Sequence, residues 1–175
     1  MALVLRADRK MFYGVPGKSG GTVTYTRMKG FTALSESKNP TEYSRKYVDE
    51  TFETVDVTGM SSSYDFTFDM MTPNAVLDDI AAIIDGEKLG EDAVREFVCV
   101  DFHRPAEEGA GYHAVKRTYS IIGDTVGDGT DALTYSGTLR VQSTITEGVA
   151  TIATPASGGT SENVETITFS DGSEA

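Results

Sequence analysis

The chain lacks tryptophan, has one cysteine and two histidines, and contains no long hydrophobic run. One cysteine, Cys99, cannot form an internal disulfide, and its flanks Val98, Val100 and Asp101 lack the histidine or cationic setting that activates a thiolate. We therefore expect Cys99 to be a small buried core residue. No stretch approaches the roughly 20 apolar residues that a membrane-spanning helix needs, so we expect no membrane partner.

Basic residues are also scarce. The chain carries 15 Lys or Arg against 27 Asp or Glu, a formal net charge of −12. This balance argues against a surface that binds nucleic acid, because affinity for phosphate depends on clustered cations. The first thirty residues hold six basic residues and one acid, a net of +5, which leaves −17 for the remainder. Such polarity suits head-to-tail contact between copies, and it equally fits a basic arm with a solvated acidic tail.

The residues that are present predict one mainly β domain over residues 1–175, a β-sandwich or partly closed barrel with one flanking helix. β-branched and aromatic residues recur at every second position, and turn residues separate the runs. In Ser63–Asp69, for example, three aromatic residues alternate with Asp65, Thr67 and Asp69. We expect strands at Lys10–Gly14, Thr22–Met28, Phe31–Ser35, Lys46–Asp49, Phe52–Val57, Ser63–Asp69, Phe97–Phe102, Tyr112–Ile121, Thr138–Ile145, Gly148–Ala153 and Val164–Phe169.

One helix is expected, at about Pro73–Asp85. Thr72 is a suitable N-cap, Pro73 suits the first helical position, and Gly86 suits a left-handed C-cap. The apolar residues of this segment recur at helical spacing, which predicts that it covers a β core. We also expect an N-terminal arm at about residues 1–10 and a mobile acidic segment at about residues 154–175.

Several groups of residues approach a catalytic or binding motif and fall short of it. The run Gly14–Ser19 ends like a phosphate loop, but Phe12 stands where that motif needs its first glycine. The run Gly123–Asp131 carries three aspartates without calcium-loop spacing. His103 and His113 flank one loop and lack a third zinc ligand. We therefore expect no enzyme, no metal and no cofactor.

The sequence resembles the major tail protein of long-tailed bacteriophages, the siphophage tail tube family, in several stretches that occur in the family's order. The Gly90–Phe102 block (GEDAVREFVCVDF) is the most specific of them. The stretches together cover most of Gly14–Thr151. They are Thr22–Met28, Lys29–Lys38 (KGFTALSESK), Glu42–Asp56, Tyr64–Phe68, the helix, Gly90–Phe102, Ala114–Ile121 (AVKRTYSI) and Gly127–Thr138.

This resemblance implies a structural virion protein that assembles in the host cytoplasm as hexameric rings stacked into a tail tube. Strands of neighbouring subunits would join around a channel through which double-stranded DNA passes without specific binding. The implied partners are other copies of the chain, a tape-measure protein, a tail terminator and distal tail or baseplate proteins. Two alternatives remain: a tube subunit of a contractile injection or type VI-like apparatus, and a monomeric β-sandwich that binds a ligand.

The polar region from about Ser37 to Met60 is long for a simple hairpin, so we expect it to reach an adjacent ring or subunit. Its carboxylates would lie on the polar face of a hairpin or in its loop, where they discourage stray strand pairing. A chain without Asn39–Gly59 should stay soluble and fail to polymerise. The candidate contact residues are Asn39, Glu42, Tyr43, Arg45, Lys46, Tyr47, Asp49, Glu50, Glu53 and Asp56, with Arg6, Arg9 and Lys10 in the N-terminal arm.

Overall fold

Two long strands, β7 (Val94–Pro105) and β8 (Tyr112–Val126), form a hairpin to which the rest of the sheet is joined. The computed structural model describes residues 3–17, 22–106, 111–127, 131–153 and 165–171. The other strands of the main sheet are β1 (Arg9–Val15), β2 (Thr24–Arg27), β3 (Phe31–Ser37), β6 (Ser63–Asp69), β9 (Thr134–Val141), β10 (Thr146–Ile152) and β11 (Thr166–Asp171).

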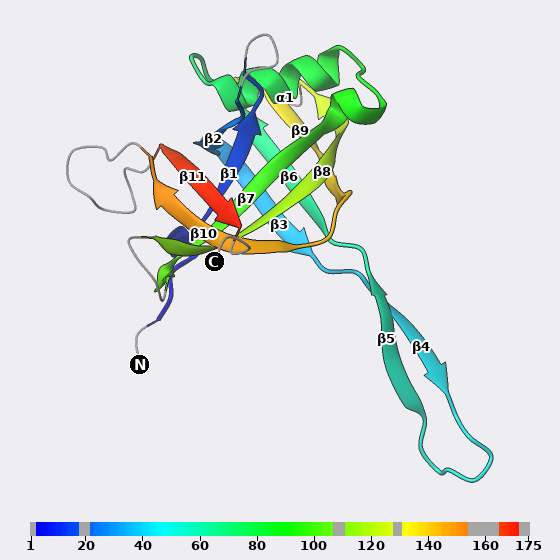
Figure 1. Cartoon of the computed structure of the whole chain (residues 1–175). Coiled ribbons are helices and arrows are strands. Elements are labelled where there is room, and N and C mark those ends of the chain that lie inside the picture. Colours follow the sequence, from blue (N-terminus) through cyan, green and yellow to red (C-terminus); the bar gives the residue numbers. More distant parts are fainter. Residues whose placement is uncertain (1–2, 18–21, 107–110, 128–130, 154–164, 172–175) are drawn as a thin grey trace.

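The sheet has nine strands in the order β10-β11-β2-β1-β7-β8-β9-β6-β3, with all neighbours antiparallel. Strand β10 also pairs with the first half of β8, so β1, β2, β11, β10, β8 and β7 close into a barrel. Strands β9, β6 and β3 continue from β8 as an open sheet (Figure 1). The predicted mainly β, partly closed barrel with one helix is therefore confirmed.

Alternating residues of β1, β7 and β8 fill two separate cores. Phe12, Val98 and Ala114 point into the closed barrel. The residues that alternate with them along the strands, such as Tyr13, point to the opposite side. There they enter a concave surface that β1, β7, β8, β9, β6 and β3 form together. We call this surface the trough. Both faces of the central strands are apolar because both are buried.

The helix α1 (Ala75–Asp85) covers one end of the trough (Figure 1). Its predicted apolar stripe is confirmed, since Val76, Leu77, Ile80 and Ile83 are buried there. The predicted start was wrong: Asn74, not Thr72, is the N-cap, and its side-chain oxygen accepts hydrogen bonds from the amides of Val76 and Leu77.

The predicted left-handed C-cap at Gly86 was also wrong. Gly86 has a φ of −81°, and the left-handed residue is Glu87, with a φ of 46°. A Cβ atom at Gly86 would lie 2.7 Å from the carbonyl oxygen of Ala82, so the position needs glycine for space rather than for its dihedral angle.

Most predicted strands are confirmed, with shifted ends. The expected strand Lys46–Asp49 is wrong, because those residues lie at the end of a hairpin whose first strand, β4 (Pro40–Arg45), the sequence pattern did not indicate. The strand expected at Thr138–Ile145 ends earlier, at Val141. Within the described residues no helix has the length and apolar character needed to cross a membrane.

Candidate assembly surfaces

A two-stranded hairpin, separate from the main sheet, projects from the body at the end opposite α1 (Figure 1). It consists of β4 and β5 (Thr54–Met60), and we call residues 39–60 the arm. Every residue of the arm except Gly59 is exposed. An isolated two-stranded hairpin is at best marginally stable in water. The described contacts of the arm are therefore few outside its own two strands.

Local hydrogen bonds hold the two ends of the arm. At its base Asn39, with a φ of 42°, donates from Nδ2 to the carbonyl oxygen of Ser61 at 3.0 Å and to Ser63 Oγ at 3.1 Å. At its tip the amide of Glu50 donates to the carbonyl oxygen of Tyr47 at 3.1 Å, which closes a turn. These bonds fix where the arm leaves the body and where it reverses.

One face of the arm is organised around Arg45. Its guanidinium lies 5.5 Å from the ring centroid of Tyr43 and 5.4 Å from that of Tyr47. It also donates to Asp56 across the hairpin at 3.2 Å. Each such exposed contact contributes about 1 kcal/mol or less. These contacts therefore hold the face only weakly.

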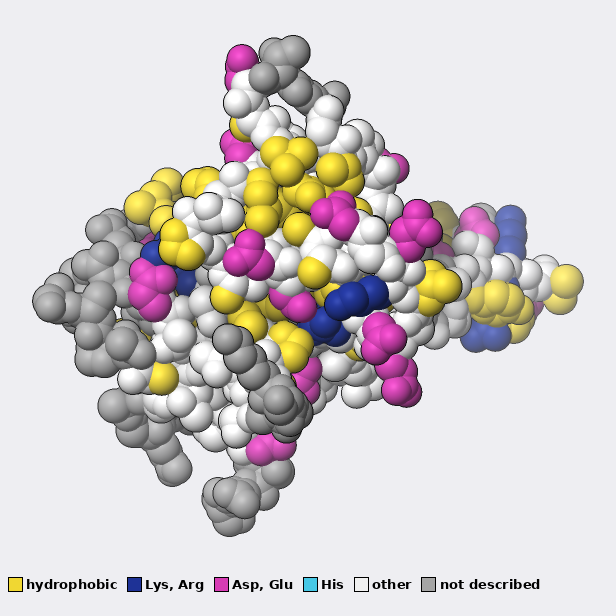
Figure 2. All heavy atoms as spheres, turned by 90° about the horizontal axis from the view of Figure 1, so that it is seen from above, with side chains coloured by type: hydrophobic (Ala, Val, Ile, Leu, Met, Phe, Trp, Pro, Cys, Tyr) yellow, Lys and Arg dark blue, Asp and Glu magenta, His cyan; other side chains and the backbone are white. Residues whose placement is uncertain are grey.

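The arm also exposes large apolar side chains. Phe52, at the tip, is 83% exposed, and Val48 beside it has no cover. Val55 and Val57 lie on the side of β5 that is opposite Asp56. Seen from the α1 end, the arm extends from the body with hydrophobic and basic side chains uncovered (Figure 2). Exposed apolar groups gathered on one element are typical of an interaction site.

All ten candidate contact residues from Asn39 to Asp56 lie in this arm. The carboxylates of Asp49, Glu50 and Glu53 lie in the tip loop and that of Asp56 on β5, as predicted for a hairpin and its loop. What these residues contact in an assembly stays a prediction. The residues that the sequence did not single out are the apolar ones, above all Phe52, whose exposure no pattern indicated.

The N-terminal candidates lie elsewhere. Arg6 belongs to a 3-10 turn, η1 (Arg6–Asp8), and donates to the carbonyl oxygen of Arg9 at 2.6 Å. Arg9 and Lys10 begin β1 rather than a projecting arm. The side chain of Lys10 is buried, and its Nζ lies 5.0 Å from the ring centroid of Phe102.

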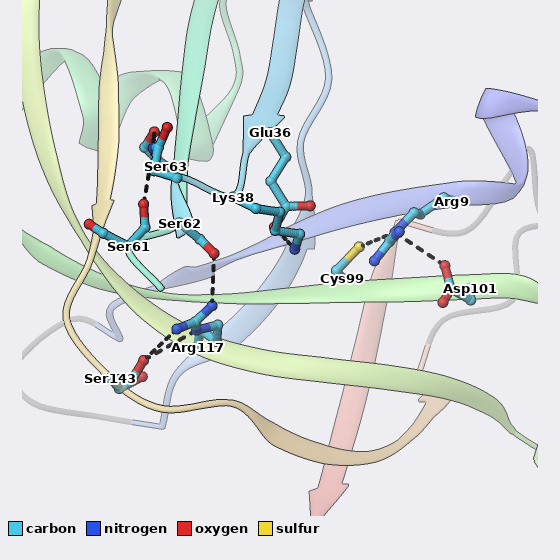
Figure 3. Close-up of polar contacts among 11 residues, drawn as sticks. Arg9, Glu36, Lys38, Ser61, Ser62, Ser63, Cys99, Asp101, Arg117 and Ser143 are labelled. Atoms are coloured by element: carbon cyan, nitrogen blue, oxygen red, sulfur yellow. Dashed lines mark hydrogen bonds and ion pairs between the residues drawn. The ribbon is translucent and has the colours of Figure 1, made fainter. Parts of the chain in front are cut away.

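These basic residues border the open end of the trough, opposite α1. Figure 3 shows Arg9 on β1, Lys38 after β3 and Arg117 on β8 directed toward a common space. We call this opening the mouth. Two adjoining hollows of about 330 and 100 Å³ form it. Its charged side chains are Arg6, Arg9, Lys38 and Arg117 against Glu36 and Asp101, a net charge of +2, since the side chain of Lys10 points into the barrel over Phe102.

Cys99 lies in the mouth and is only partly buried, so the prediction of a core cysteine was wrong. Arg9 Nε donates to Cys99 Sγ at 3.1 Å and lies 3.2 Å from Asp101 Oδ1. Burial raises the pKa of the Cys99 thiol, although the hydrogen bond from Arg9 opposes the shift.

Partly buried hydrogen bonds hold α1 over the other end of the trough. The hydroxyl of Tyr13 donates to Asp79 Oδ2 at 2.5 Å, and Arg95 Nε donates to the same oxygen at 2.8 Å. Burial opposes ionisation of Asp79, but the bonds from Arg95 and Tyr13 prevail and lower its pKa. Tyr135 donates to Asp85 at 2.8 Å near the end of the helix.

The open sheet has an uncovered polar face. The side chains of β6, β9, β3 and the second half of β8 that point away from the trough are mostly serine, threonine and aspartate, with Arg140 the one cation and Ile122 the one large apolar residue among those named below. Thr138 donates to Asp65 at 3.0 Å and Thr134 to Asp69 at 3.3 Å. The residues are Ala33, Ser35, Asp65, Thr67, Asp69, Ser120, Ile122, Thr125, Thr134, Ser136, Thr138 and Arg140.

Two margins of this sheet have unpaired backbone in the described part of the chain. Strand β3 pairs with β6 on one side and with no strand on the other. Strand β8 pairs with β7 only as far as Ser120, so the flank from Ile121 to Val126 is open. A groove of about 770 Å³ borders that flank, lined by Ile84, Leu89 and Ile122 among others. Open strand margins are templates for pairing with another chain.

The groups that resemble phosphate, calcium or zinc motifs in the sequence do not form such a site in the described residues. Lys18, Ser19 and Asp128 lie outside the described residues. His113 pairs in register with Asp101, so His103 does not face it across the hairpin. In the ranges that the structure describes, no group of three or more histidines, cysteines and carboxylates is close enough to hold a metal ion.

The fold is similar to that of a chain in a solved tail structure. A chain from the tail of an empty GTA particle, solved by helical refinement with C6 symmetry, superposes with a TM-score of 0.57 at 12% identity, covering 82% of this chain and 97% of that one. A chain of the six-fold symmetrised anti-feeding prophage (AFP) baseplate gives a TM-score of 0.48 at 8% identity, with 84% and 96% covered. No family model matches the sequence, and no curated protein matches it.

At 12% identity the first likeness concerns the fold alone. This chain therefore shares the fold of a chain from the tail of a GTA particle. The uncovered arm and the open sheet margins are the features from which a function can be argued.

Proposed function

We propose that this chain is a tail tube subunit, a structural protein that polymerises as stacked hexameric rings. One observation carries the proposal: a single four-stranded sheet, β8-β9-β6-β3, has open backbone at both margins and an uncovered polar face between them. A monomeric binding module is expected to block such margins, since unpaired strand edges pair with other chains and cause aggregation.

The two margins are complementary. Three antiparallel steps separate β8 from β3, so β3 runs opposite to β8. A β3 strand laid beside the open flank of β8 in a second copy would therefore continue the antiparallel pattern. The two surfaces differ, which makes the contact heterologous, and a heterologous contact repeated around an axis closes into a ring when the rotation allows. The C6 symmetry of the GTA tail favours six copies.

The polar face would then line the channel. Its ionisable side chains include Asp65 and Asp69 against Arg140, and each aspartate accepts a hydrogen bond from a neighbouring threonine. A surface with few cations and a slight excess of carboxylates does not hold phosphate. Double-stranded DNA would slide along such a lining during ejection, as a conduit requires.

The arm would join rings along the axis. It continues from β3 and β6 beyond the end of the sheet, on the side opposite α1 (Figure 1). In a ring it would therefore point toward the next ring rather than toward its own neighbours. In this role Phe52, Val55 and Val57 bury apolar surface on a copy in the adjacent ring. The subunit would act in the virion tail with a tape-measure protein, a tail terminator and distal tail proteins, after assembly in the host cytoplasm.

Electron microscopy of the purified full chain tests this proposal. We expect negatively stained tubes or rings at high protein concentration, and a solution mass of at least six times the 18.8 kDa of one chain. A protein that stays monomeric at every concentration would contradict the proposal and favour a monomeric binding module.

A further inference from the structure

The mouth of the trough is an unusual surface for this protein, because it is basic in a chain of net charge −12. Its walls are apolar, with Met11, Leu34 and Tyr64 beside the hollow of about 330 Å³. Arg117 has no carboxylate partner among the described residues and donates to the carbonyl oxygen of Ser143 and to Ser62 Oγ. An acidic segment that carries one apolar side chain would complement this surface.

The opposite end of the body presents such a segment. The loop of residues 86–92 (GEKLGED) follows α1 and holds Glu87, Glu91 and Asp92 against one lysine, a net charge of −2. Leu89, at its centre, is 82% exposed. Left-handed residues flank it on both sides, Glu87 with a φ of 46° and Gly90 with a φ of 60°. Leu89 therefore lies at the rim of the groove beside β8, largely exposed and among acidic side chains.

We propose that the mouth of one copy receives Leu89 and the acidic residues of this loop from a second copy. The charges are opposite, and the mouth supplies apolar walls for the leucine. The loop lies at the α1 end, where hydrophobic and acidic side chains gather on the surface (Figure 2), and the mouth lies at the other end of the same trough. One copy can therefore use both surfaces at once.

This contact deepens the proposed function and rests on it. Two different surfaces at opposite ends give a heterologous contact that does not close on itself, so repetition produces an open stack. The arm leaves the body at Lys38, beside the mouth. The arm and the mouth would therefore contact the same neighbouring ring. Between successive rings, the mouth of a subunit in one ring would thus bind the loop of a subunit in the next.

Cys99 makes this contact measurable, because the chain's one thiol lies in the mouth. A disulfide needs Cα atoms within about 7 Å. In the full chain, Leu89→Cys oxidised with copper phenanthroline should give a ladder of dimers, trimers and longer species on a non-reducing gel. The ladder should vanish in Leu89→Cys/Cys99→Ser. Leu133→Cys is the matched control, since Leu133 is an exposed leucine on the loop before β9 and is expected to give no ladder.

The outcomes separate this contact from the proposed function. Tubes without a ladder would overturn the contact and leave the tail tube standing. Neither tubes nor a ladder would overturn both. A product that stops at dimers would also refute the contact, because a head-to-tail arrangement adds copies at both ends.

Charge reversal gives a test that needs no cysteine. Glu87→Arg/Glu91→Arg should lose tubes and keep single rings by electron microscopy. Adding Arg6→Glu/Lys38→Glu to that variant should restore tubes, since the loop is then basic and the mouth acidic. Tubes of normal length in the loop variant alone would contradict the proposal.

Discussion

The body and the arm use the same residue types for different purposes. In the body Phe68 is fully buried, and its ring stacks on Tyr135 with centroids 5.2 Å apart. In the arm Phe52 is 83% exposed, and no ring contact joins it to another residue in the described part of the chain. An aromatic ring in the trough stabilises the monomer, whereas one on the arm leaves apolar surface for another molecule to cover.

Charged residues show the same difference. Asp79, on the side of α1 that faces β1 and β7, is partly buried between Tyr13 and Arg95, so its bonds stabilise the position of the helix. Asp56 pairs with Arg45 in solvent, where an ion pair contributes about 1 kcal/mol or less. The buried contacts of the trough therefore stabilise the monomer, whereas the contacts within the arm contribute little to it.

The largest expected effect comes from removing the arm. Replacing Thr41–Gly59 by Asn-Gly keeps the hydrogen bonds of Asn39 at the base. We expect the variant to stay folded by circular dichroism and to form no tubes by electron microscopy. Normal tubes from this variant would refute the role of the arm, and an unfolded chain would refute the claim that the body is stable without it.

A matched pair of phenylalanine substitutions sharpens the comparison. Phe68→Ala removes a fully buried ring and should lower the free energy of unfolding by about 3–5 kcal/mol. Phe52→Ala should change it by less than about 0.5 kcal/mol and should weaken tube formation instead. Urea unfolding of the monomer and sedimentation of tubes measure the two effects. Similar stability losses in both variants would show that the arm packs on its own body.

Asp79→Asn should reveal the buried carboxylate through pH. The folded-state pKa of Asp79 is lowered, so its stabilisation is present above the unfolded pKa of about 3.9 and is lost as pH falls through the folded value. At pH 7 the free energy of unfolding of the variant should be about 1.5–3 kcal/mol lower than that of the natural chain. The gap from the natural chain should narrow in acid. Asp78→Asn, at an exposed neighbour, should cost about 1 kcal/mol or less, and an equal loss there would contradict the assignment.

The smallest effect concerns the polar face. Asp65→Lys/Asp69→Lys should give tubes that retain double-stranded DNA in co-sedimentation at low salt and release it as salt rises. Asp131→Lys/Asp171→Lys makes the same charge change at exposed positions elsewhere and should retain less DNA. Equal retention by both variants would argue against this face as the channel lining.

Periodicity in the sequence was sufficient to predict the aromatic strand at Ser63–Asp69 and the apolar stripe of α1, because each depends on neighbours close in the chain. The cap of the helix was mispredicted, since Thr72 and Asn74 are both good N-caps and only the approach of the chain to the trough decides between them. The strand expected at Lys46–Asp49 failed because a turn at Tyr47 competes with the same alternating pattern.

The assembly surfaces were predictable in part. The length and polarity of the segment from Ser37 to Met60 located the arm. The mouth was not foreseen, because Arg9, Lys38 and Arg117 lie on three strands far apart in the sequence. Leu89 was missed because one leucine between charged residues has no periodic signal. The open flank of β8 depends on where β7 begins, which a sequence pattern does not define to the residue.

The central claim is that β3 of one subunit completes the sheet of the next. A helical reconstruction of assembled tubes at a resolution that separates strands tests it most directly. The account predicts β3 about 4.8 Å from the flank of β8 after Ser120 in the neighbouring subunit, with Asp65 and Asp69 facing the channel. A reconstruction in which β3 faces solvent, or in which those aspartates lie on the outer wall, would contradict it.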